Sequence, residues 1–165
     1  MKKQFMGLMV IFFAVISIVS AQSICVDAGH GGTDPGAVGW GLQEKVINLD
    51  VSNRLYTVLQ NAGYKVYRTR SGDSFVELSS RTSYANSVGA SRFISIHCNA
   101  FNQSAHGTET FCYSSGSSTS FNMRDKVHPK IVTAFGTTDR GVKTASYYVL
   151  KRSEERRVGK ECRSR

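Results

Sequence analysis

The stretch SICVDAGHGGTDPGAVGWGLQEKVINLDVSNRLYTVLQNAG, residues 23–63, decides the fold. Ser23–Asp27 is a short β-rich run that ends in glycines. Glu44–Ala62 carries apolar residues at helical spacing, and Gly63 is placed to cap the C-terminus of that helix. The stretch therefore predicts a strand, a glycine-rich loop and a helix, in that order.

The same alternation continues along the chain. Tyr64–Thr69 is a predicted strand, Leu78–Val88 is a predicted helix that Gly89 ends, and Arg92–Cys98 is a predicted third strand. Strands that alternate with helices indicate an α/β fold, with a mostly parallel, twisted sheet and helices on both faces.

The pattern is less regular after residue 106. Gly107–Tyr113 predicts a strand and Ser114–Ser120 a polar loop. Phe121–Phe135 predicts a helix that Pro129 either kinks or divides into two segments. Val142–Leu150 predicts a further pair of strands.

The N-terminal residues have the composition of a targeting segment. Two lysines precede the apolar run Phe5–Val19, and Val19 and Ala21 have the spacing of a small-residue cleavage site. We therefore expect a signal peptide over residues 1–21, export to the periplasm or the cell surface, and no stable membrane anchor after cleavage. A retained membrane anchor is the alternative, although the run is short for a span of about 20 residues.

The charge distribution argues against a nucleic-acid partner. The 165-residue chain has a formal net charge of +9. Much of this charge lies in Lys2, Lys3 and residues 152–165, and no stretch between them alternates basic and aromatic residues as a stacking groove would. A mildly basic exported domain suits an anionic polymer instead.

The four cysteines carry little functional information. They have no C-x-x-C spacing, so a structural zinc knuckle is not expected. A bridge between Cys98 and Cys112 is open in an oxidising compartment, but small buried thiols are the favoured interpretation.

Two histidines and one glutamate are candidates for a metal site. The P-loop pattern is absent from the glycine-rich loop. His30 follows the first predicted strand, His97 lies near the end of the third, and ligands bind at this edge of open α/β sheets. With Glu44 at the head of the first helix, they would leave one position of a tetrahedral Zn²⁺ for water. Alternatively, Glu44 favours the positive end of the helix dipole and each histidine is structural or solvated.

Several blocks of the sequence resemble a known family. DAGHGGTDPGAVG, EKVINLDVSNRLYTVLQNAGYKVYRTR, LSSRTSYANSVGASRFISIHCNA, GTETF and RGVKTASYYVL resemble, in order, motifs of the zinc-dependent N-acetylmuramoyl-L-alanine amidases, the family Amidase 3. The resemblance covers about residues 23–151 and implies that His30, Glu44 and His97 bind Zn²⁺. It also implies hydrolysis of the amide between N-acetylmuramic acid and L-alanine in peptidoglycan.

Further residues are candidates for supporting roles. Asn99 would share the face of His97 if the strand is extended, and Arg81 would meet stem-peptide carboxylates, although surface salt bridging is the default for an arginine. Asp27 either orients a ligand histidine or caps a turn. His106 and His128 match no metal position of the family, so solvated or structural roles are expected.

Residues 152–165, RSEERRVGKECRSR, depart from the family pattern. Family members continue into a buried strand that bears a general acid/base glutamate and then a last helix. This segment is densely charged and resembles the translation of a sequencing-library adapter, in which AGA TCG GAA GAG encodes its first four residues. We expect a non-native, disordered tail. A genuine basic tail that docks on wall polymers is the alternative.

This departure bears on the expected activity. The catalytic glutamate is expected beyond Lys151 and is missing there, and the family motif does not assign Glu109 to that role. The sequence thus predicts an incomplete amidase domain over residues 22–151, without the family's last strand and helix and with impaired hydrolysis. The alternatives are a non-catalytic peptidoglycan-binding protein and another zinc peptidase.

Overall fold

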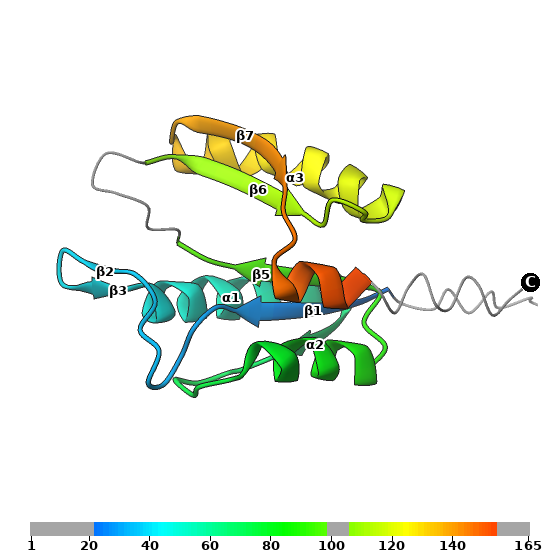
Figure 1. Ribbon diagram of the computed structural model, residues 1–165, viewed down its shortest axis with the longest axis horizontal. Coiled ribbons are helices and arrows are strands. Elements are labelled where there is room, and N and C mark those ends of the chain that lie inside the picture. The colour runs from blue at the N-terminus through cyan, green and yellow to red at the C-terminus, as the bar shows by residue number, and fades with distance from the viewer. Residues whose placement is uncertain (1–21, 99–105, 155–165) are drawn as a thin grey trace, which may run out of the picture.

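A three-stranded parallel sheet lies at the centre of the computed structural model, which describes residues 22–98 and 106–154. β1 (Ser23–Ala28) lies between β4 (Lys65–Arg68) and β5 (Arg92–Ile96), and both pairings are parallel (Figure 1). The β1 strand is almost wholly buried, as expected for the middle strand of a parallel sheet. The predicted α/β class and parallel sheet are confirmed.

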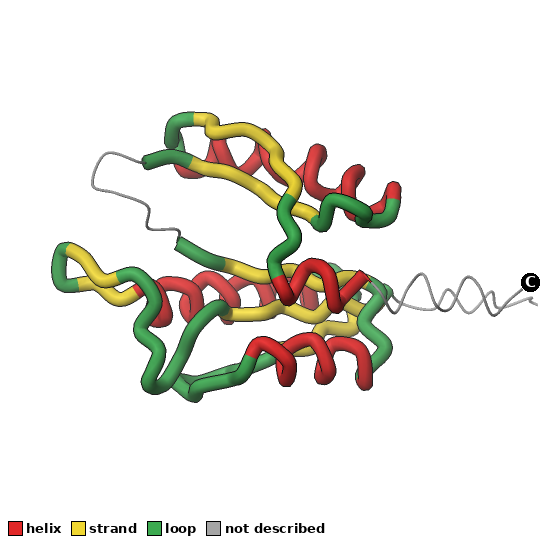
Figure 2. Tube along the Cα trace, in the orientation of Figure 1, coloured by secondary structure: helices red, strands yellow, loops and turns green. Residues whose placement is uncertain are grey.

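Helices cover both faces of this sheet. α1 (Glu44–Asn61) lies on one face, where Arg68 of β4 donates a hydrogen bond to Asn53. α2 (Leu78–Ser87) lies on the other, where its Ala85 joins the core cluster. Figure 2 shows α1 behind the strands and a last helix, residues 148–154, in front of them.

A short hairpin that the sequence analysis did not predict leads into α1. β2 (Val38–Gly39) pairs antiparallel with β3 (Leu42–Gln43), and Glu44 begins the helix directly after β3. The two strands are only two residues long, so no alternating apolar pattern could reveal them.

A second parallel pair of strands carries the rest of the chain. β6 (Thr108–Cys112) pairs with β7 (Asp139–Thr144), and α3 (Ser118–Phe135) packs against both. α3 begins three residues before the predicted start because Ser117 caps it, accepting a hydrogen bond from the Ser120 backbone N–H. Pro129 lies inside this single helix, so it does not divide the segment in two.

The prediction of two strands over Val142–Leu150 is wrong. β7 ends at Thr144, and the chain then turns into the helix of residues 148–154. Val149 is buried with Cys25, Ala85 and Phe93, so its apolar side chain faces the core from a helix and not from a strand. Short apolar runs do not distinguish these two cases.

The expectation of a disordered tail from residue 152 onward does not hold for its first three residues. Residues 152–154 continue the last helix, and Ser153 and Glu154 are buried. The Ser120 hydroxyl donates a hydrogen bond to Glu154, which gives the buried carboxylate a polar partner. The remaining tail, 155–165, and the predicted signal peptide, 1–21, lie outside the described residues. In the described part of the chain, no helix combines the length and the apolar character needed to cross a bilayer.

Candidate metal centre

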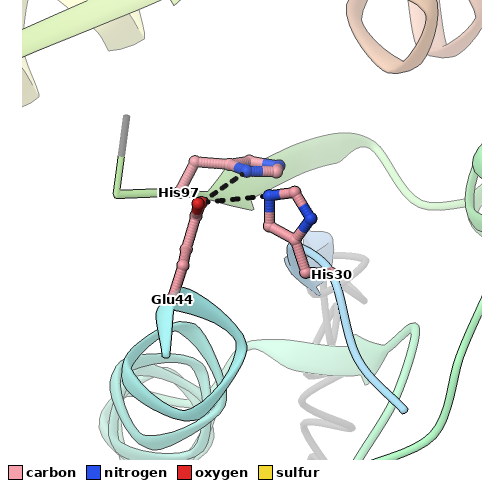
Figure 3. Close-up of side chains that lie close together, drawn as sticks. All are labelled: His30, Glu44 and His97. Carbon is pink, nitrogen blue, oxygen red and sulfur yellow. Dashed lines mark hydrogen bonds and ion pairs between the residues drawn. The ribbon is translucent and has the colours of Figure 1, made fainter. Parts of the chain in front are cut away.

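Three side chains from separate elements converge at the carboxyl edge of the main sheet. His30 follows β1, His97 follows β5, and Glu44 is the first residue of α1 (Figure 3). Nε2 of His30 lies 3.2 Å from Oε1 of Glu44, and Nδ1 of His97 lies 3.0 Å from the same oxygen. The structure therefore brings together the three residues that the sequence analysis selected as metal ligands.

The geometry of this cluster fits one small metal ion. One ligand atom from each residue lies within 4.8 Å of the other two. Ligand atoms about 2.0–2.2 Å from a tetrahedral Zn²⁺ are roughly 3.3–3.6 Å apart, so small side-chain adjustments suffice. Two imidazole nitrogens and one carboxylate oxygen are donors that zinc accepts, and three protein ligands leave a fourth position open.

Glu44 is held as a carboxylate by its surroundings. It is only 5% exposed, and burial alone would raise its pKa. Hydrogen bonds from His97, from the backbone N–H groups of Ala37 and Cys98, and from the Asn48 amide outweigh burial and lower the pKa of Glu44 to about 2. The carboxylate is thus ionised, which is the form that binds a metal.

Asn48 is a supporting residue that the sequence analysis missed. It is fully buried on α1, one turn after Glu44, and donates hydrogen bonds to Glu44 Oε1 and to the Gly29 carbonyl. Residues four apart share a helix face, so a polar residue four positions after a candidate ligand was the available signal.

His30 is oriented by Asp34, which was also missed. Oδ2 of Asp34 lies 2.8 Å from Nδ1 of His30, so Nε2 is the nitrogen directed at Glu44. This hydrogen bond lowers the pKa of Asp34, although partial desolvation opposes it. The backbone of His30 has a φ of 59°, a left-handed conformation that few non-glycine residues adopt.

Two glycines make room for the ligand side chains. A Cβ at Gly29 would lie 2.3 Å from Cε1 of the His97 imidazole, and one at Gly36 would lie 2.6 Å from Cδ2 of His30. These glycines of the loop thus permit the close packing of the candidate metal ligands.

Asp27 and Arg81 form a buried ion pair beneath the loop. Their side chains are 1% and 3% exposed, and Nη1 of Arg81 lies 2.8 Å from Oδ1 of Asp27. Arg81 also donates to the carbonyls of Ala28 and His30. Asp27 accepts from the hydroxyl groups of Thr69 and Ser95 and contacts no histidine, which excludes one of the two roles left open for it, the orientation of a ligand histidine.

Surface salt bridging was the default expectation for an arginine, but Arg70 and Arg81 are both buried. Arg81 is buried with its guanidinium committed to the loop, a geometry that does not favour the expected contact with substrate carboxylates. Arg70 is 4% exposed and donates to the carbonyls of Ala28, Gly29 and Lys45, and burial lowers its pKa. Both arginines thus fix the backbone segments that carry His30 and Glu44.

A cavity of about 400 Å³ opens beside His97. Its lining is mostly apolar and aromatic and comes from α2, β5, β6 and the last helix: Leu78, Ser95, His97, Glu109, Phe111, Tyr147, Tyr148, Val149 and Leu150. Apolar pockets with a few polar groups are typical ligand sites. Here the polar groups include a candidate metal ligand and one carboxylate, Glu109.

The other candidates lie elsewhere or outside the described residues. Asn99, a predicted substrate contact, lies outside them. His128 is buried between Thr110 and Asp139, a structural role as expected, and His106 belongs to no described metal cluster. Cys25, Cys98 and Cys112 are free thiols, and burial raises the pKa of Cys25 to about 12.

Fold and site together define an α/β protein with a His, Glu, His centre at the carboxyl edge of a parallel sheet. The family model described as N-acetylmuramoyl-L-alanine amidase, Amidase_3, matches residues 24–163, and the chain belongs to this family. The match extends past Lys151, into the segment that we expected to lie outside the domain.

Curated relatives and solved structures agree with this assignment. The chain is 41% identical over 138 residues to the N-acetylmuramoyl-L-alanine amidase LytC of Bacillus subtilis (82% of this chain, 28% of the relative). It is 39% identical over 132 residues to the sporulation-specific amidase of the same organism (79% and 51%). The catalytic domain of CwlV from Bacillus (Paenibacillus) polymyxa var. colistinus superposes with a TM-score of 0.73 at 34% identity, covering 79% of this chain and 73% of that one. The chain thus spans about half or less of the length of these two curated relatives.

Proposed function

We propose that this chain hydrolyses the amide between N-acetylmuramic acid and L-alanine in peptidoglycan, with Zn²⁺ held by His30, Glu44 and His97. The observation that carries the proposal is the convergence of these side chains beside an open cavity, in a chain of the amidase family. Bound Zn²⁺ supplies Lewis-acid polarisation of the carbonyl and lowers the pKa of water from 15.7 to about 7.

The residues of the chain prepare this chemistry in distinct ways. Asp34 fixes the ring of His30, and Asn48 fixes the carboxylate of Glu44. The low pKa of Glu44 keeps a negative charge in the site, which balances part of the charge of a divalent ion. The cavity beside His97 offers a mostly apolar lining against which part of the substrate can pack.

A general acid/base is the remaining requirement of the reaction. Glu109 is the acid that lines the cavity in the described part of the chain, but Arg140 and Lys143 both contact its Oε2. A carboxylate engaged by two cations is a weak proton acceptor. We therefore propose that Glu109 is not the general acid/base of this reaction.

Product analysis tests the proposal. Purified peptidoglycan is incubated with the zinc-loaded chain, and new amino termini are labelled and identified by mass spectrometry. New L-alanine termini support the amidase. Cleavage within the stem peptide would indicate the peptidase alternative, and sedimentation with sacculi without any release would indicate a binding protein. Glu109→Gln should leave the rate unchanged, whereas His97→Ala should abolish it.

We also propose that the chain acts outside the cytoplasm, with residues 1–21 as a cleaved signal peptide and 22–151 as the main catalytic unit. One relative is named an N-acetylmuramoyl-L-alanine amidase and another an uncharacterized cell wall amidase, and peptidoglycan lies outside the cytoplasmic membrane. Mass spectrometry of the exported protein should give a chain that begins near Gln22. A mature chain that begins at Met1 would exclude cleavage.

A further inference from the structure

Trp40 occupies an unusual place at the tip of the β2–β3 hairpin. It is the single tryptophan of the chain, and its relative exposure of 102% means that no other described residue covers the indole. Figure 1 shows the hairpin extending from the N-terminal end of α1. We propose that Trp40 is a saccharide-binding residue, whose indole stacks on a sugar ring of the glycan strand while the attached peptide lies at the metal centre. This inference rests on the proposed function.

The backbone at this tip is not one that tryptophan favours. Trp40 and Gly41 form the two-residue turn between the strands, with φ values of 54° and 74°. Positive φ at both central residues is the pattern of a type I′ turn, in which asparagine or glycine is preferred at the first position. Tryptophan is therefore disfavoured here both by turn geometry and by exposure of its large apolar surface. Such outliers are concentrated at functional sites.

The hairpin is continuous with the metal centre. Trp40 precedes Glu44 by four residues, at most about 13 Å of extended chain. Two hydrogen bonds close the base of the hairpin on this ligand: the Glu44 N–H donates to the Ala37 carbonyl, and the Ala37 N–H donates to Glu44 Oε2. In a substrate with its amide at the metal centre, the glycan strand continues in both directions from that point. The strand therefore passes within reach of the indole.

The chemistry of the hairpin surface fits a neutral sugar better than a membrane. Its exposed neighbours are the aliphatic side chains of Val38, Leu42 and Val46. The adjacent cation, Lys45, is engaged by the Gly32 carbonyl and by Asp73, so it does not add positive charge to this surface. Anionic lipid surfaces are recognised by clusters of lysine and arginine, whereas the C–H face of a pyranose ring packs on an uncharged aromatic ring.

The single tryptophan makes the proposal directly measurable. The zinc-loaded chain is titrated with soluble glycan strands of alternating N-acetylglucosamine and N-acetylmuramic acid from which the peptides have been removed. Because no amide remains to be cut, the experiment measures binding alone. We expect a saturable blue shift or quenching of the tryptophan emission, which reports only on residue 40.

Substitution separates binding from folding. Trp40→Asn creates the preferred Asn-Gly turn, so its melting temperature should equal or exceed that of the wild type, while affinity for the same glycan, measured by calorimetry, should fall roughly fivefold or more. Phe135→Ala, at an aromatic residue that is 65% exposed at the end of α3, is the matched control and should bind normally.

Three outcomes would overturn the proposal. If the glycan leaves the tryptophan emission unchanged and Trp40→Asn binds the glycan as tightly as the wild type does, stacking on Trp40 is excluded. An emission shift with phosphatidylglycerol vesicles but not with glycan would assign the hairpin to a membrane, and a shift that depends only on protein concentration would assign it to a second copy of the chain. Failure to release any L-alanine termini from intact peptidoglycan after long incubation, with a retained glycan response, would refute the proposed function and leave the saccharide site in place.

Discussion

The buried Asp27–Arg81 pair should contribute far more to stability than an exposed pair of the same chemistry. In the Arg81→Ala variant, the Asp27 carboxylate stays inside the protein, 1% exposed, with only the hydroxyl groups of Thr69 and Ser95 as hydrogen-bond partners. Removing one member of a buried ion pair typically costs about 3–5 kcal/mol in the free energy of unfolding.

The lost hydrogen bonds act in the same direction. Arg81 also donates to the carbonyls of Ala28 and His30; the Ala28 carbonyl keeps a donor in Arg70, whereas the His30 carbonyl loses the Arg81 donor, and an unsatisfied buried acceptor costs about 1–3 kcal/mol. These contributions overlap because all the contacts involve one guanidinium, so we expect a total near the upper part of the 3–5 kcal/mol range. This is a large share of the roughly 5–15 kcal/mol that stabilises a domain.

Urea unfolding in the presence of a chelator measures this loss without a contribution from metal binding. Arg54→Ala is the matched control, because Arg54 pairs with Asp50 at the surface, with side chains 78% and 59% exposed. That pair should contribute less than about 1 kcal/mol. If Arg81→Ala does not fold, Arg81→Lys keeps the charge but loses the guanidinium donors that reach several backbone carbonyls, and should give an intermediate loss. An Arg81 variant as stable as the Arg54 control would refute the reasoning.

Three further predictions concern the loop and the second sheet. Asp34→Asn should weaken zinc binding about 10- to 100-fold, measured by chelator competition, because Asp34 orients a ligand imidazole; an unchanged affinity would contradict this. Gly29→Ala should abolish zinc binding, since its Cβ would lie 2.3 Å from the ring of His97, whereas Gly72→Ala meets no atom within 4 Å and should bind normally. Asp139 has a pKa below its ordinary 3.8 because a histidine and a backbone N–H donate to it, so its contribution to stability is present above pH 3.8 and lost below it. In the Asp139→Asn variant, the free energy of unfolding should fall less steeply as the pH decreases through this acidic range. An unchanged pH dependence would exclude Asp139 as the source of that loss.

The parallel sheet and its helices were predictable because they repeat strong local patterns. β1, α1 and α2 begin and end within one or two residues of the sequence prediction, where apolar spacing and helix-ending glycines coincide. The last helix was not predictable, because the apolar run that includes Val149 fits a strand or a helix equally well. Only its packing against the core decides between them.

The convergence of His30, Glu44 and His97 was predictable, but the residues that support them were only partly so. His30 and His97 each follow a strand, and parallel strands end at the same edge, so their proximity follows from topology. The role of Asp34 depends on a left-handed turn at His30 that no periodicity encodes. The buried state of Arg81 depends on a carboxylate 54 positions away, and such long-range pairing is not visible in one sequence.

X-ray absorption at the zinc K-edge tests the central claim most directly, because it reports the atoms bound to the metal in the loaded chain. The account predicts about one zinc ion per chain, with two imidazole nitrogens at about 2.0–2.1 Å, carboxylate oxygen at about 2.0–2.2 Å and no sulfur. His30→Ala and His97→Ala should each lose the ion. A zinc–sulfur distance of about 2.3 Å would place a cysteine in the coordination shell and contradict the account, as would an unchanged spectrum in both variants.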